Sequence, residues 1–434
     1  MELTRFFQSA FTSLVNYGWE IIFRHPPSPE VIQQIKKFFI FGAGMLVAKI
    51  MAIAAQIIMG RKFGPEFYGE MTIILLLSGY FAMPIVNGWG LVFTKIAARE
   101  KDKKKKEQAL KSLLFIVCIC GILTILFLFV LQKPLSNLLD ISPQSMKLTL
   151  LMTVFYAWWI LTKQIAQGLQ HWHTYVIIEN TWAAIVLLGL LGIFFLQQTV
   201  DLIAVSTVFF LGYFLSGLFF LKQICQSFFV KIRLEYIKDI LSHGWFLLLN
   251  GLVGVATFSI DRVFINRSLG AEEVGIYQAH FVSTYGIISA FMTIFLTYIF
   301  PIFCRNDNML TILSKINRMQ YPFTILISIL IGNFVLRLYS YPVSFALFGS
   351  LCLFNAVQFH VQLKIWYLAS RGASETKTTL QSQLIFLIVN LAVLIILIRY
   401  AGIVAGGISL LAGACACLAY LIQSEHTAYN ERSV

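Results

Sequence analysis

Twelve long apolar stretches dominate this sequence and restrict the chain to folds that cross a membrane. Charged residues make up only 12% of the chain, against about 25% in a typical soluble domain, and the mean hydropathy is +0.79. A helix needs about 20 mostly apolar residues to cross the hydrocarbon core of a bilayer. The sequence therefore predicts an all-α integral membrane protein with transmembrane helices at residues 37–59, 70–93, 112–131, 148–168, 175–196, 201–221, 243–265, 276–303, 320–338, 343–367, 379–398 and 402–423.

The basic residues indicate how these helices cross the membrane. Of the 33 Lys and Arg residues, 24 fall on the side that also carries both termini and 8 on the opposite side, and Lys49, in the middle of a span, is assigned to neither. Because loops rich in Lys and Arg stay in the cytoplasm, both termini are expected to be cytoplasmic. The lysine run 103–106 lies beside a span, so we interpret it as a membrane anchor, and no nucleic-acid partner is expected.

The spans divide the chain into two halves with short flanking segments. Residues 1–24 have the spacing of an amphipathic helix that lies in the membrane interface, and a loosely ordered arm is the alternative. A secretory signal is not expected, because no compact basic region and no cleavage site stand at the N-terminus. The predicted segments are an N-terminal arm (1–35), a first six-helix lobe (36–222), a cytoplasmic linker (223–242), a second six-helix lobe (243–424) and a cytoplasmic tail (425–434).

One short phrase occurs twice, with an offset of 206 residues. Arg61, Gly64, Glu66 and Gly69 of "RKFGPEFYGE" align with Arg267, Gly270, Glu272 and Gly275 of "RSLGAEEVGIY". The same offset carries the first span onto the seventh, so the first six spans correspond to the last six. Six is an even number, so both halves begin on the same side of the membrane. The pattern predicts a parallel repeat, with a pseudo-two-fold axis along the membrane normal.

Each copy of this phrase is expected to form a tight hairpin between two long helices on the outer side. Gly64 and Gly270 can take a positive φ and end the outgoing helix. The last glycine of each phrase, Gly69 or Gly275, allows two helices to approach closely. On this chemistry the repeated residues are structural and carry no catalytic role.

The two phrases and their surroundings resemble a known transporter family. "MGRKFGPEFYGEMTIILLLSGYFAMPIVNGWGLVFTKIAARE" and "FSIDRVFINRSLGAEEVGIYQAHF" are similar to the polysaccharide transport branch of the multidrug/oligosaccharidyl-lipid/polysaccharide (MOP) exporter superfamily. That branch includes the Wzx-type flippases of O-antigen and capsule repeat units. The resemblance covers the whole chain in topology and about 80 residues in motifs, and it carries no information about the sugar.

The resemblance implies a V-shaped transporter of two lobes in the bacterial inner membrane, a multi-pass protein in contact with membrane lipid. The spans 37–59, 70–93, 243–265 and 276–303 would line a central cavity. The cargo would be a polyprenyl-diphosphate-linked oligosaccharide, moved to the outer leaflet as the lobes rock, with an H⁺ or Na⁺ gradient as the driving force. No cofactor is expected, and a polysaccharide polymerase is a further expected partner.

Polar side chains inside spans are costly, so they are functional candidates by default. Lys49 lies in the middle of the first span and is expected to face an anionic diphosphate or acidic sugar; a buried ion pair is the alternative. Gln56 lies on the same helical face, seven residues later. Lys163 and Glu179 lie near the inner ends of adjacent antiparallel spans, where a structural ion pair and a role in cargo or cation binding are both compatible with the pattern.

The second half carries further polar residues within its spans. Gln358 and Gln362 share one face of the tenth span, and His360 and Lys364 share another, where sugar binding and packing between helices are both compatible with the pattern. The remaining candidates for coupling or gating are Asp261 and Arg262, which lie near the outer end of the seventh span, and His280 in the eighth span. For these three residues a structural role between helices is the favoured alternative.

Two other functions remain as alternatives. A drug/cation antiporter of the same superfamily would need an acidic residue within a lobe, and Glu179 is the only deep carboxylate in the first half. A membrane polysaccharide polymerase or ligase would need large outer loops, whereas the outer loops here are short. No Walker A motif or other enzyme motif occurs, so the chain is not expected to be an enzyme or to use ATP directly.

Overall fold

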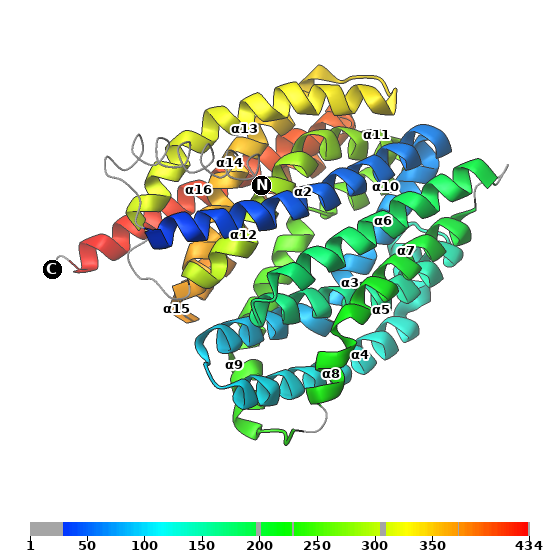
Figure 1. Ribbon diagram of the computed structural model, residues 1–434. Coiled ribbons are helices and arrows are strands. Elements are labelled where there is room, and N and C mark those ends of the chain that lie inside the picture. The colour runs from blue at the N-terminus through cyan, green and yellow to red at the C-terminus, as the bar shows by residue number, and fades with distance from the viewer. Residues whose placement is uncertain (1–28, 197–200, 228–229, 304–309, 372, 433–434) are drawn as a thin grey trace, which may run out of the picture.

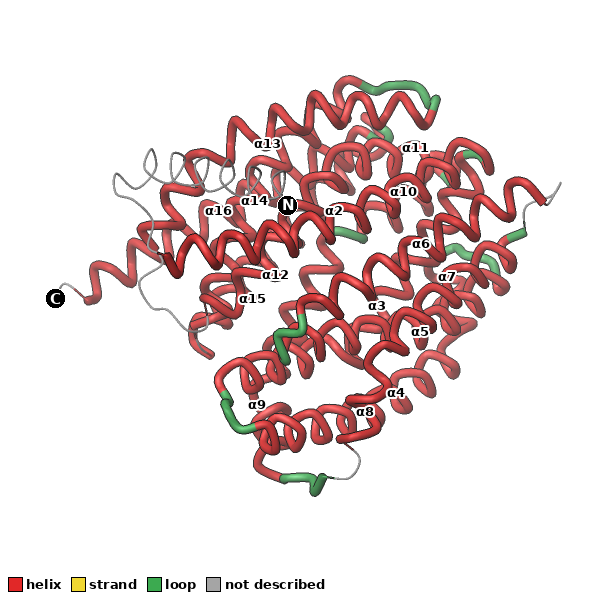
Figure 2. Tube along the Cα trace, viewed as in Figure 1, coloured by secondary structure: helices red, strands yellow, loops and turns green. Residues whose placement is uncertain are grey.

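The computed structural model describes residues 29–196, 201–227, 230–303, 310–371 and 373–432, and their regular structure is entirely helical (Figure 2). Side chains are described for residues 39–196, 201–227, 230–296, 317–368, 370 and 377–424. The first half contains α2 (Pro29–Phe63), α3 (Pro65–Arg99), α4 (Lys103–Leu139), α5 (Pro143–Gly168), α6 (Trp172–Leu196), α7 (Leu202–Gly217), η1 (Leu218–Phe220) and α8 (Leu221–Ser227). The second half contains α9 (Leu234–Thr257), α10 (Ile260–Leu269), α11 (Ala271–Phe281), η2 (Val282–Gly286), α12 (Ile287–Phe303), α13 (Leu310–Tyr339), α14 (Phe345–Arg371), α15 (Ala373–Ala401) and α16 (Val404–Arg432).

Twelve of the described helical stretches are long and apolar enough to cross a membrane, which confirms the predicted spans. Two helices extend beyond their apolar runs into polar sequence at both ends, so that the predicted span 70–93 lies within Pro65–Arg99 and the span 112–131 within Lys103–Leu139. Leu123, Phe127 and Val130 of α4 are each more than half exposed. Such a surface favours lipid over water, because lipid tails are themselves apolar.

Local sequence explains where several helices begin. Asp102 caps α4 by accepting a hydrogen bond from the backbone N–H of Lys104 (2.9 Å), and Ser142 caps α5 by accepting one from the N–H of Ser145 (3.0 Å). Each cap satisfies a backbone donor that has no partner within its helix. The helices α4, α5 and α7 start after such capping residues, with Asp201 in this position before α7.

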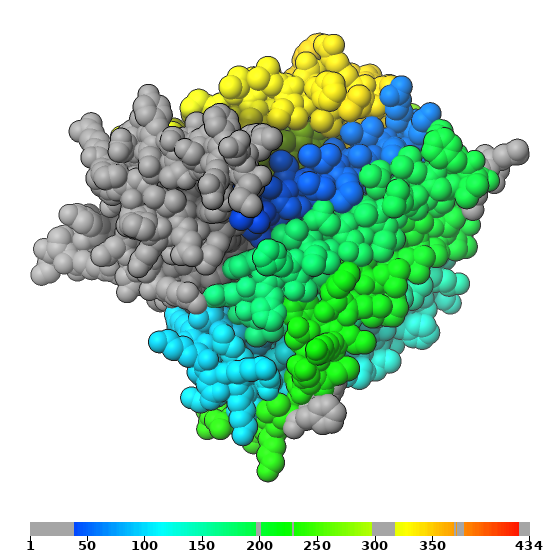
Figure 3. Space-filling view, in the orientation of Figure 1, coloured from blue at the N-terminus to red at the C-terminus, as the bar shows by residue number. Residues whose placement is uncertain are grey.

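Helices pack closely on one another within each half of the sequence. In the first half α3 packs against α5, and α6 packs against α7 and α2; in the second, α16 packs against α14 and α15. Figure 1 shows α2 running between α6 and α13, and Figure 3 shows it as a blue band between green and yellow surfaces. The two halves meet chiefly where α3 packs against α9 and α11.

The two repeated hairpins lie directly against each other. Gly64 and Gly270 have φ values of 90° and 97°, which confirms the predicted positive φ at both turns. A Cβ atom on Gly69 would lie 1.9 Å from the carbonyl oxygen of Ala271, and one on Gly275 would lie 2.0 Å from that of Pro65. In each hairpin, the backbone of the other hairpin therefore packs against the last glycine. The two contacts are equivalent, as expected for two copies related by a two-fold axis.

Aromatic residues reinforce this hairpin end of the interface. Tyr68 of α3 stacks on Tyr339 of α13, with ring centroids 5.8 Å apart. The hydroxyl of Tyr341 donates a hydrogen bond to the carbonyl oxygen of Gly60 at 2.6 Å. Tyr341 lies outside the spans, and burial raises its pKa to about 12. These contacts close the interface between the halves at the hairpin end.

The opposite, lysine-rich end is held by a second glycine contact. A Cβ atom on Gly88 of α3 would lie 2.3 Å from the carbonyl oxygen of Gly244 of α9, and one on Gly244 would lie 2.5 Å from the ring of Trp89. The predicted linker 223–242 is partly helical, because it contains the end of α8 and the beginning of α9. The predicted amphipathic helix at residues 1–24 lies outside the described residues.

Candidate functional site: a cavity between the two halves

A cavity of about 660 Å³ lies between the two halves. Its lining includes side chains of α3, α5, α9, η2, α12 and α14. Gln167, Tyr175 and Trp366 line it and lie near the ends of their spans, so the cavity reaches toward the lysine-rich end. Residues of the second, seventh and eighth spans line it as expected, whereas described residues of the first span line a separate, smaller cavity.

The fourth span takes the place of the first in the cavity wall. Six residues of α5 line the cavity with helical spacing, so that one complete face of this helix is turned to it: Tyr156, Trp159, Ile160, Lys163, Gln164 and Gln167. Residues three, four, seven and eight apart lie on one side of an α-helix. The helix α2 packs instead against α6 of the first half and against α12 and α13 of the second half.

Breaks in two helices shape the opposite wall. The seventh span is interrupted between α9 and α10, where the N–H groups of Phe258 and Ser259 bond to Val255 and Ala256 three residues earlier. The eighth span contains the π-helical segment Val282–Gly286, a type of distortion that often occurs at functional sites. Phe258 and Tyr285, one from each break, stack at 5.3 Å and line the cavity.

Amide side chains supply most of the polar groups in the lining. Gln164 donates a hydrogen bond to Asn87 at 3.4 Å. The amide oxygens of Gln164, Asn250 and Gln383 are buried and receive no hydrogen bond from any described residue. Buried polar atoms normally have partners, so these oxygens are available to donors of a bound molecule, such as sugar hydroxyls.

Lys163 is the charged residue among the described lining residues, and it is paired with a buried carboxylate. Its Nζ lies 2.5 Å from Oε1 of Glu179, while Nζ of Lys49 lies 3.7 Å from Oε2. Glu179 is 0% exposed. Two lysines around one carboxylate leave this cluster with a net positive charge next to the cavity.

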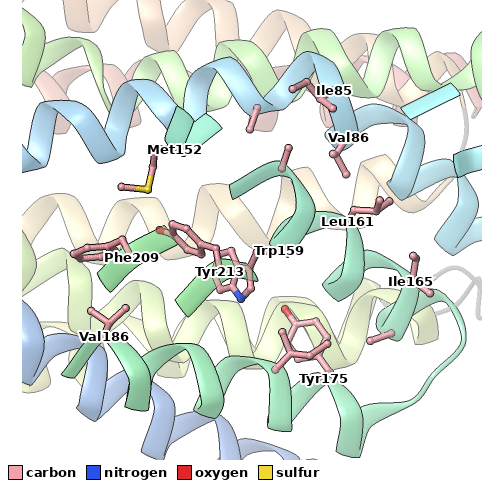
Figure 4. Packing of buried hydrophobic residues seen from close by; sticks show 14 of the residues in the cluster. Ile85, Val86, Met152, Trp159, Leu161, Ile165, Tyr175, Val186, Phe209 and Tyr213 are labelled. Atoms are coloured by element: carbon pink, nitrogen blue, oxygen red, sulfur yellow. The ribbon is translucent and has the colours of Figure 1, made fainter. Parts of the chain in front are cut away.

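Aromatic rings surround the Lys163 ammonium group. It lies 3.6 Å from the ring centroid of Trp159 and 5.8 Å from that of Tyr175, distances typical of cation–π contacts. Figure 4 shows Trp159, Tyr175 and Tyr213 together in this packing, and Trp159 and Tyr213 have centroids 5.2 Å apart. The rings hold the ammonium group at the cavity wall and present flat apolar faces beside it.

The structure brings together Lys49, Lys163 and Glu179, and for Lys49 it shows the ion-pair alternative. Lys49 is on α2 and does not line the cavity, although its side chain remains 22% exposed. Gln56 accepts a hydrogen bond from the Tyr68 hydroxyl at 3.1 Å and lines a separate, smaller cavity nearer the hairpins. The two residues thus share a helical face but not a site.

The tenth-span candidates are dispersed. Gln362 lines the cavity, whereas Gln358 is 0% exposed and neither of its amide atoms has a partner among the described residues. His360 forms a hydrogen bond with the Tyr321 hydroxyl at 2.8 Å, away from the cavity lining. Lys364 is also outside the lining. Of these four residues, only Gln362 is placed to contact a molecule in the cavity.

Asp261 and Arg262 form an ion pair within the second half. Nη1 of Arg262 lies 3.2 Å from Oδ1 of Asp261, and Nε donates to Oε1 of Gln278 at 2.6 Å. The Tyr277 hydroxyl donates to Asp261, and Arg262 donates to the carbonyl oxygen of Phe258 that the helix break leaves open. The carboxylate is thus fully engaged, and Arg262 is held against the smaller cavity, which it lines.

His280 has the contacts of a structural histidine. Nδ1 donates to the carbonyl oxygen of Ile276 at 2.9 Å, and Nε2 accepts from the N–H of Ser344 at 3.1 Å. Both contacts require the neutral ring with its proton on Nδ1. His280 therefore connects α11 to the loop before α14, and neither described cavity includes it.

Sequence reasoning missed most of the cavity wall. It named Lys163 and Gln362 but not Tyr156, Gln164 or Asn250, which line the cavity with them. The spacing of Tyr156, Lys163 and Gln164 on one helix was the available signal for the α5 face. For Asn250 the available signal was a lone amide inside the predicted span 243–265, where a polar side chain is costly.

Solved structures show the same fold at low sequence identity. An inward-facing multidrug resistance MATE family transporter of the MOP superfamily is 13% identical, with a TM-score of 0.68 over 89% of this chain and 96% of that chain. A MOP superfamily transporter from Pyrococcus furiosus is 15% identical, with a TM-score of 0.65 over 91% and 95%. The lipid II flippase MurJ, in an inward closed conformation, is 12% identical, with a TM-score of 0.60 over 89% and 87%.

The family is shown by a match in sequence. No curated protein matches the chain, but the family model described as polysaccharide biosynthesis protein matches residues 35–307. This match covers more than half of the chain, including the first lobe, both hairpins and most of the cavity wall. The chain therefore belongs to the polysaccharide biosynthesis protein family, and its twelve membrane-length helices have the fold of the solved MOP superfamily transporters.

Proposed function

We propose that this protein is a flippase that moves polyprenyl-diphosphate-linked oligosaccharides across the bacterial inner membrane by alternating access. The observation that carries the proposal is the chemistry of the cavity between the halves. One ammonium group, Lys163, lies at a wall that also offers amides, hydroxyls, aromatic rings and aliphatic side chains. Family membership and the likeness to the fold of the lipid II flippase support a lipid-linked substrate.

Each part of such a cargo has a counterpart in the lining. The diphosphate would pair with Lys163, because charge-assisted hydrogen bonds to phosphate are among the stronger polar contacts. Sugar hydroxyls would donate to the amide oxygens of Gln164, Asn250 and Gln383. Gln362 adds a further amide on the facing wall. The prenyl chain would remain in the surrounding lipid, where it loses no hydrophobic stabilisation.

The hairpin contacts and the position of the main cavity suggest the direction of loading. The hairpin end is closed by the Gly69 and Gly275 contacts, and the cavity reaches toward the lysine-rich end. If lysine-rich loops are cytoplasmic, as in most membrane proteins, the cavity receives cargo from the cytoplasm. Rocking of the two halves, driven by an H⁺ or Na⁺ gradient, would then expose it outside, where a polymerase takes it up.

A drug/cation antiporter is the second candidate, favoured by the buried carboxylate of Glu179 and by the fold shared with a multidrug transporter. Its chemistry fits less well. Glu179 already has two ammonium groups within 4 Å of its oxygens, at 2.5 and 3.7 Å. A coupling or drug cation would have to displace or approach these like charges, which disfavours it.

Transport by the purified protein in lipid vesicles tests the proposal. The vesicles would contain lipid-linked oligosaccharide extracted from the cells that make the protein, and a membrane-impermeant oxidant would report the sugar on the outer face. Wild-type protein is expected to move the cargo. The Lys163→Gln variant is expected to be slower by roughly tenfold, the equivalent of about 1.4 kcal/mol in binding the diphosphate.

Two comparisons make the result specific. Lys133→Gln removes an exposed lysine outside the cavity and is expected to transport like the wild type. Transport of a cationic dye with no transport of the lipid-linked sugar would contradict the flippase and support the antiporter. Equal rates for Lys163→Gln and Lys133→Gln would remove Lys163 from the mechanism.

A further inference from the structure

A second cavity of about 300 Å³ lies nearer the hairpins than the main one. We call it the hairpin-side chamber. Side chains of α2, α3, α5, α6 and α7 form most of it, and Arg262 and Gln278 of the second half complete it. Gln56, Arg262 and Gln278 each stand eight residues from Gly64 or Gly270, which places the chamber between the hairpins and the middle of the membrane.

One layer of side chains separates the chamber from the main cavity. Leu75 and Leu76 of α3 and Tyr156 and Trp159 of α5 line both. The two cavities therefore share a wall, and the chamber lies on the hairpin side of the main cavity.

The chamber is walled by aromatic rings whose polar groups are not all satisfied. Trp182 stacks on Tyr213 at 5.7 Å and 9°, and Trp159 lies 5.0 Å from Trp182. The indole N–H groups of Trp159 and Trp182 are buried and donate to no described residue. A buried donor without an acceptor is destabilising, so an acceptor-rich ligand would gain from filling the chamber.

Arg262, whose charge is balanced by Asp261, adds a guanidinium group with one unused nitrogen. Its Nε bonds to Gln278, and its Nη1 bonds to Phe258 and Asp261. Nη2 has no acceptor among the described residues, and the side chain is only 4% exposed. An arginine fixed in this way is pre-organised for phosphate or carboxylate, because its planar fork does not need to be ordered on binding.

We propose that the hairpin-side chamber is a second binding site, which holds the sugar-phosphate end of the cargo after it leaves the main cavity. This rests on the flippase function proposed above. The ligand class is a sugar ring that bears an anionic group: the ring lies against Trp159, Trp182 and Tyr213, its oxygens accept from the two indoles, and the anion binds Arg262. A volume of about 300 Å³ is less than half that of the main cavity and suits part of a headgroup.

A bulky side chain that fills the chamber is expected to slow transport without weakening binding in the main cavity. Ala52 of α2 lines the chamber but not the main cavity, so Ala52→Phe places a ring in the chamber and leaves the Lys163 site unaltered. The purified variant is expected to bind the extracted lipid-linked oligosaccharide with wild-type affinity. Its transport in vesicles is expected to fall by roughly tenfold or more, because the headgroup has no second place to occupy.

A control on the same helix and a second variant exclude misfolding. Ile50 is 58% exposed, so Ile50→Phe adds similar bulk on the outer surface and is expected to behave like the wild type. Trp182→Phe keeps a ring and removes one N–H donor, so it is expected to transport more slowly with unchanged binding. If Ala52→Phe does not fold, Trp182→Phe still tests whether transport needs the chamber.

The possible results distinguish failure of the chamber proposal from failure of the flippase proposal. Absence of transport by the wild type would overturn the flippase itself. Wild-type transport with equally fast Ala52→Phe and Trp182→Phe would overturn only the chamber, as would a folded Ala52→Phe that loses binding together with transport. N-acetylglucosamine 1-phosphate is added to the transport assay as a competitor, beside inorganic phosphate and the free sugar. The proposed ligand class is supported if the sugar phosphate inhibits transport more than the other two compounds and if this inhibition depends on Trp182. Equal inhibition of transport by all three compounds contradicts it.

Discussion

The Lys163 ammonium group lies 2.5 Å from Oε1 of Glu179, on the neighbouring antiparallel helix. The same lysine lines the cavity, whereas the carboxylate is fully buried behind it. A cargo phosphate that binds Lys163 therefore competes with an internal carboxylate for the same ammonium group. Glu179 keeps the lysine from being an isolated charge when the cavity is empty, since an unpaired charge at this depth would be costly.

The first prediction concerns the stability of this ion pair. Lys163→Gln is expected to destabilise the protein by about 3–5 kcal/mol, because it leaves a buried carboxylate with only the longer contact to Lys49. Glu179→Gln added to that variant is expected to restore much of the loss, since the pair is coupled. Thermal unfolding of the two single variants and the double variant in detergent measures the coupling.

Lys49→Gln is the matched comparison for the variants at Lys163 and Glu179. Lys49 is 3.7 Å from Glu179 and its side chain is 22% exposed, so its removal is expected to lower the unfolding temperature less than removal of Lys163. Additive effects of Lys163→Gln and Glu179→Gln would show that the two groups do not stabilise each other.

The second prediction concerns the contact between the hairpins. Gly275→Ala puts a Cβ atom 2.0 Å from the carbonyl oxygen of Pro65, so the backbone must move. Overpacking of this kind is destabilising by about 1–3 kcal/mol, and the unfolding temperature should fall. Gly349→Ala is the control, because a Cβ there meets nothing within 4 Å. Equal unfolding temperatures for both variants would mean that the hairpins do not need their close approach.

The third prediction uses the phenol that bonds to Gly60. Tyr341→Phe removes one hydrogen bond of 2.6 Å, with a net loss of about 1 kcal/mol. Because burial raises the pKa of Tyr341 to about 12, the phenol keeps its proton at pH 7 and at pH 9. The lowering of the unfolding temperature by this substitution is therefore expected to be the same at both pH values.

The raised pKa of Tyr341 determines how the stability gained from its hydrogen bond depends on pH. The stabilisation by the protonated phenol is fully present below pH 10, the usual value, and is lost as the pH rises toward about 12. A difference between wild type and Tyr341→Phe that does not shrink between pH 9 and about pH 11 would indicate a tyrosine whose pKa is not raised.

The fourth prediction separates structure from proton sensing at His280. His280→Ala removes hydrogen bonds to Ile276 and Ser344 and is expected to be destabilising by about 1–3 kcal/mol. Transport per folded molecule should keep the pH dependence of the wild type, because His280 lines neither cavity. A shifted pH profile with unchanged stability would instead assign His280 to coupling.

The site candidates show the limit of reasoning from sequence at particular residues. Lys163 and Glu179 were expected to meet because they flank one short turn between antiparallel helices. Lys49 was placed at the cavity because its span corresponds to a lining helix of the family, but α2 packs against α6 and carries it to the far side of Glu179. Its partner lies 130 residues away, and no local pattern indicates which face of one helix meets which face of another.

The sequence by itself determined the spans, the two-fold repeat and the two hairpin turns. Hydrocarbon requires long apolar helices, and a positive φ at Gly64 and Gly270 requires glycine. Only the tertiary structure decided that the hairpins receive each other at Gly69 and Gly275, that α5 replaces α2 in the cavity wall, and that Lys163 faces the cavity. These features depend on contacts between distant helices, and in a membrane nearly every helix face is apolar, so hydrophobic periodicity alone does not tell which face is buried.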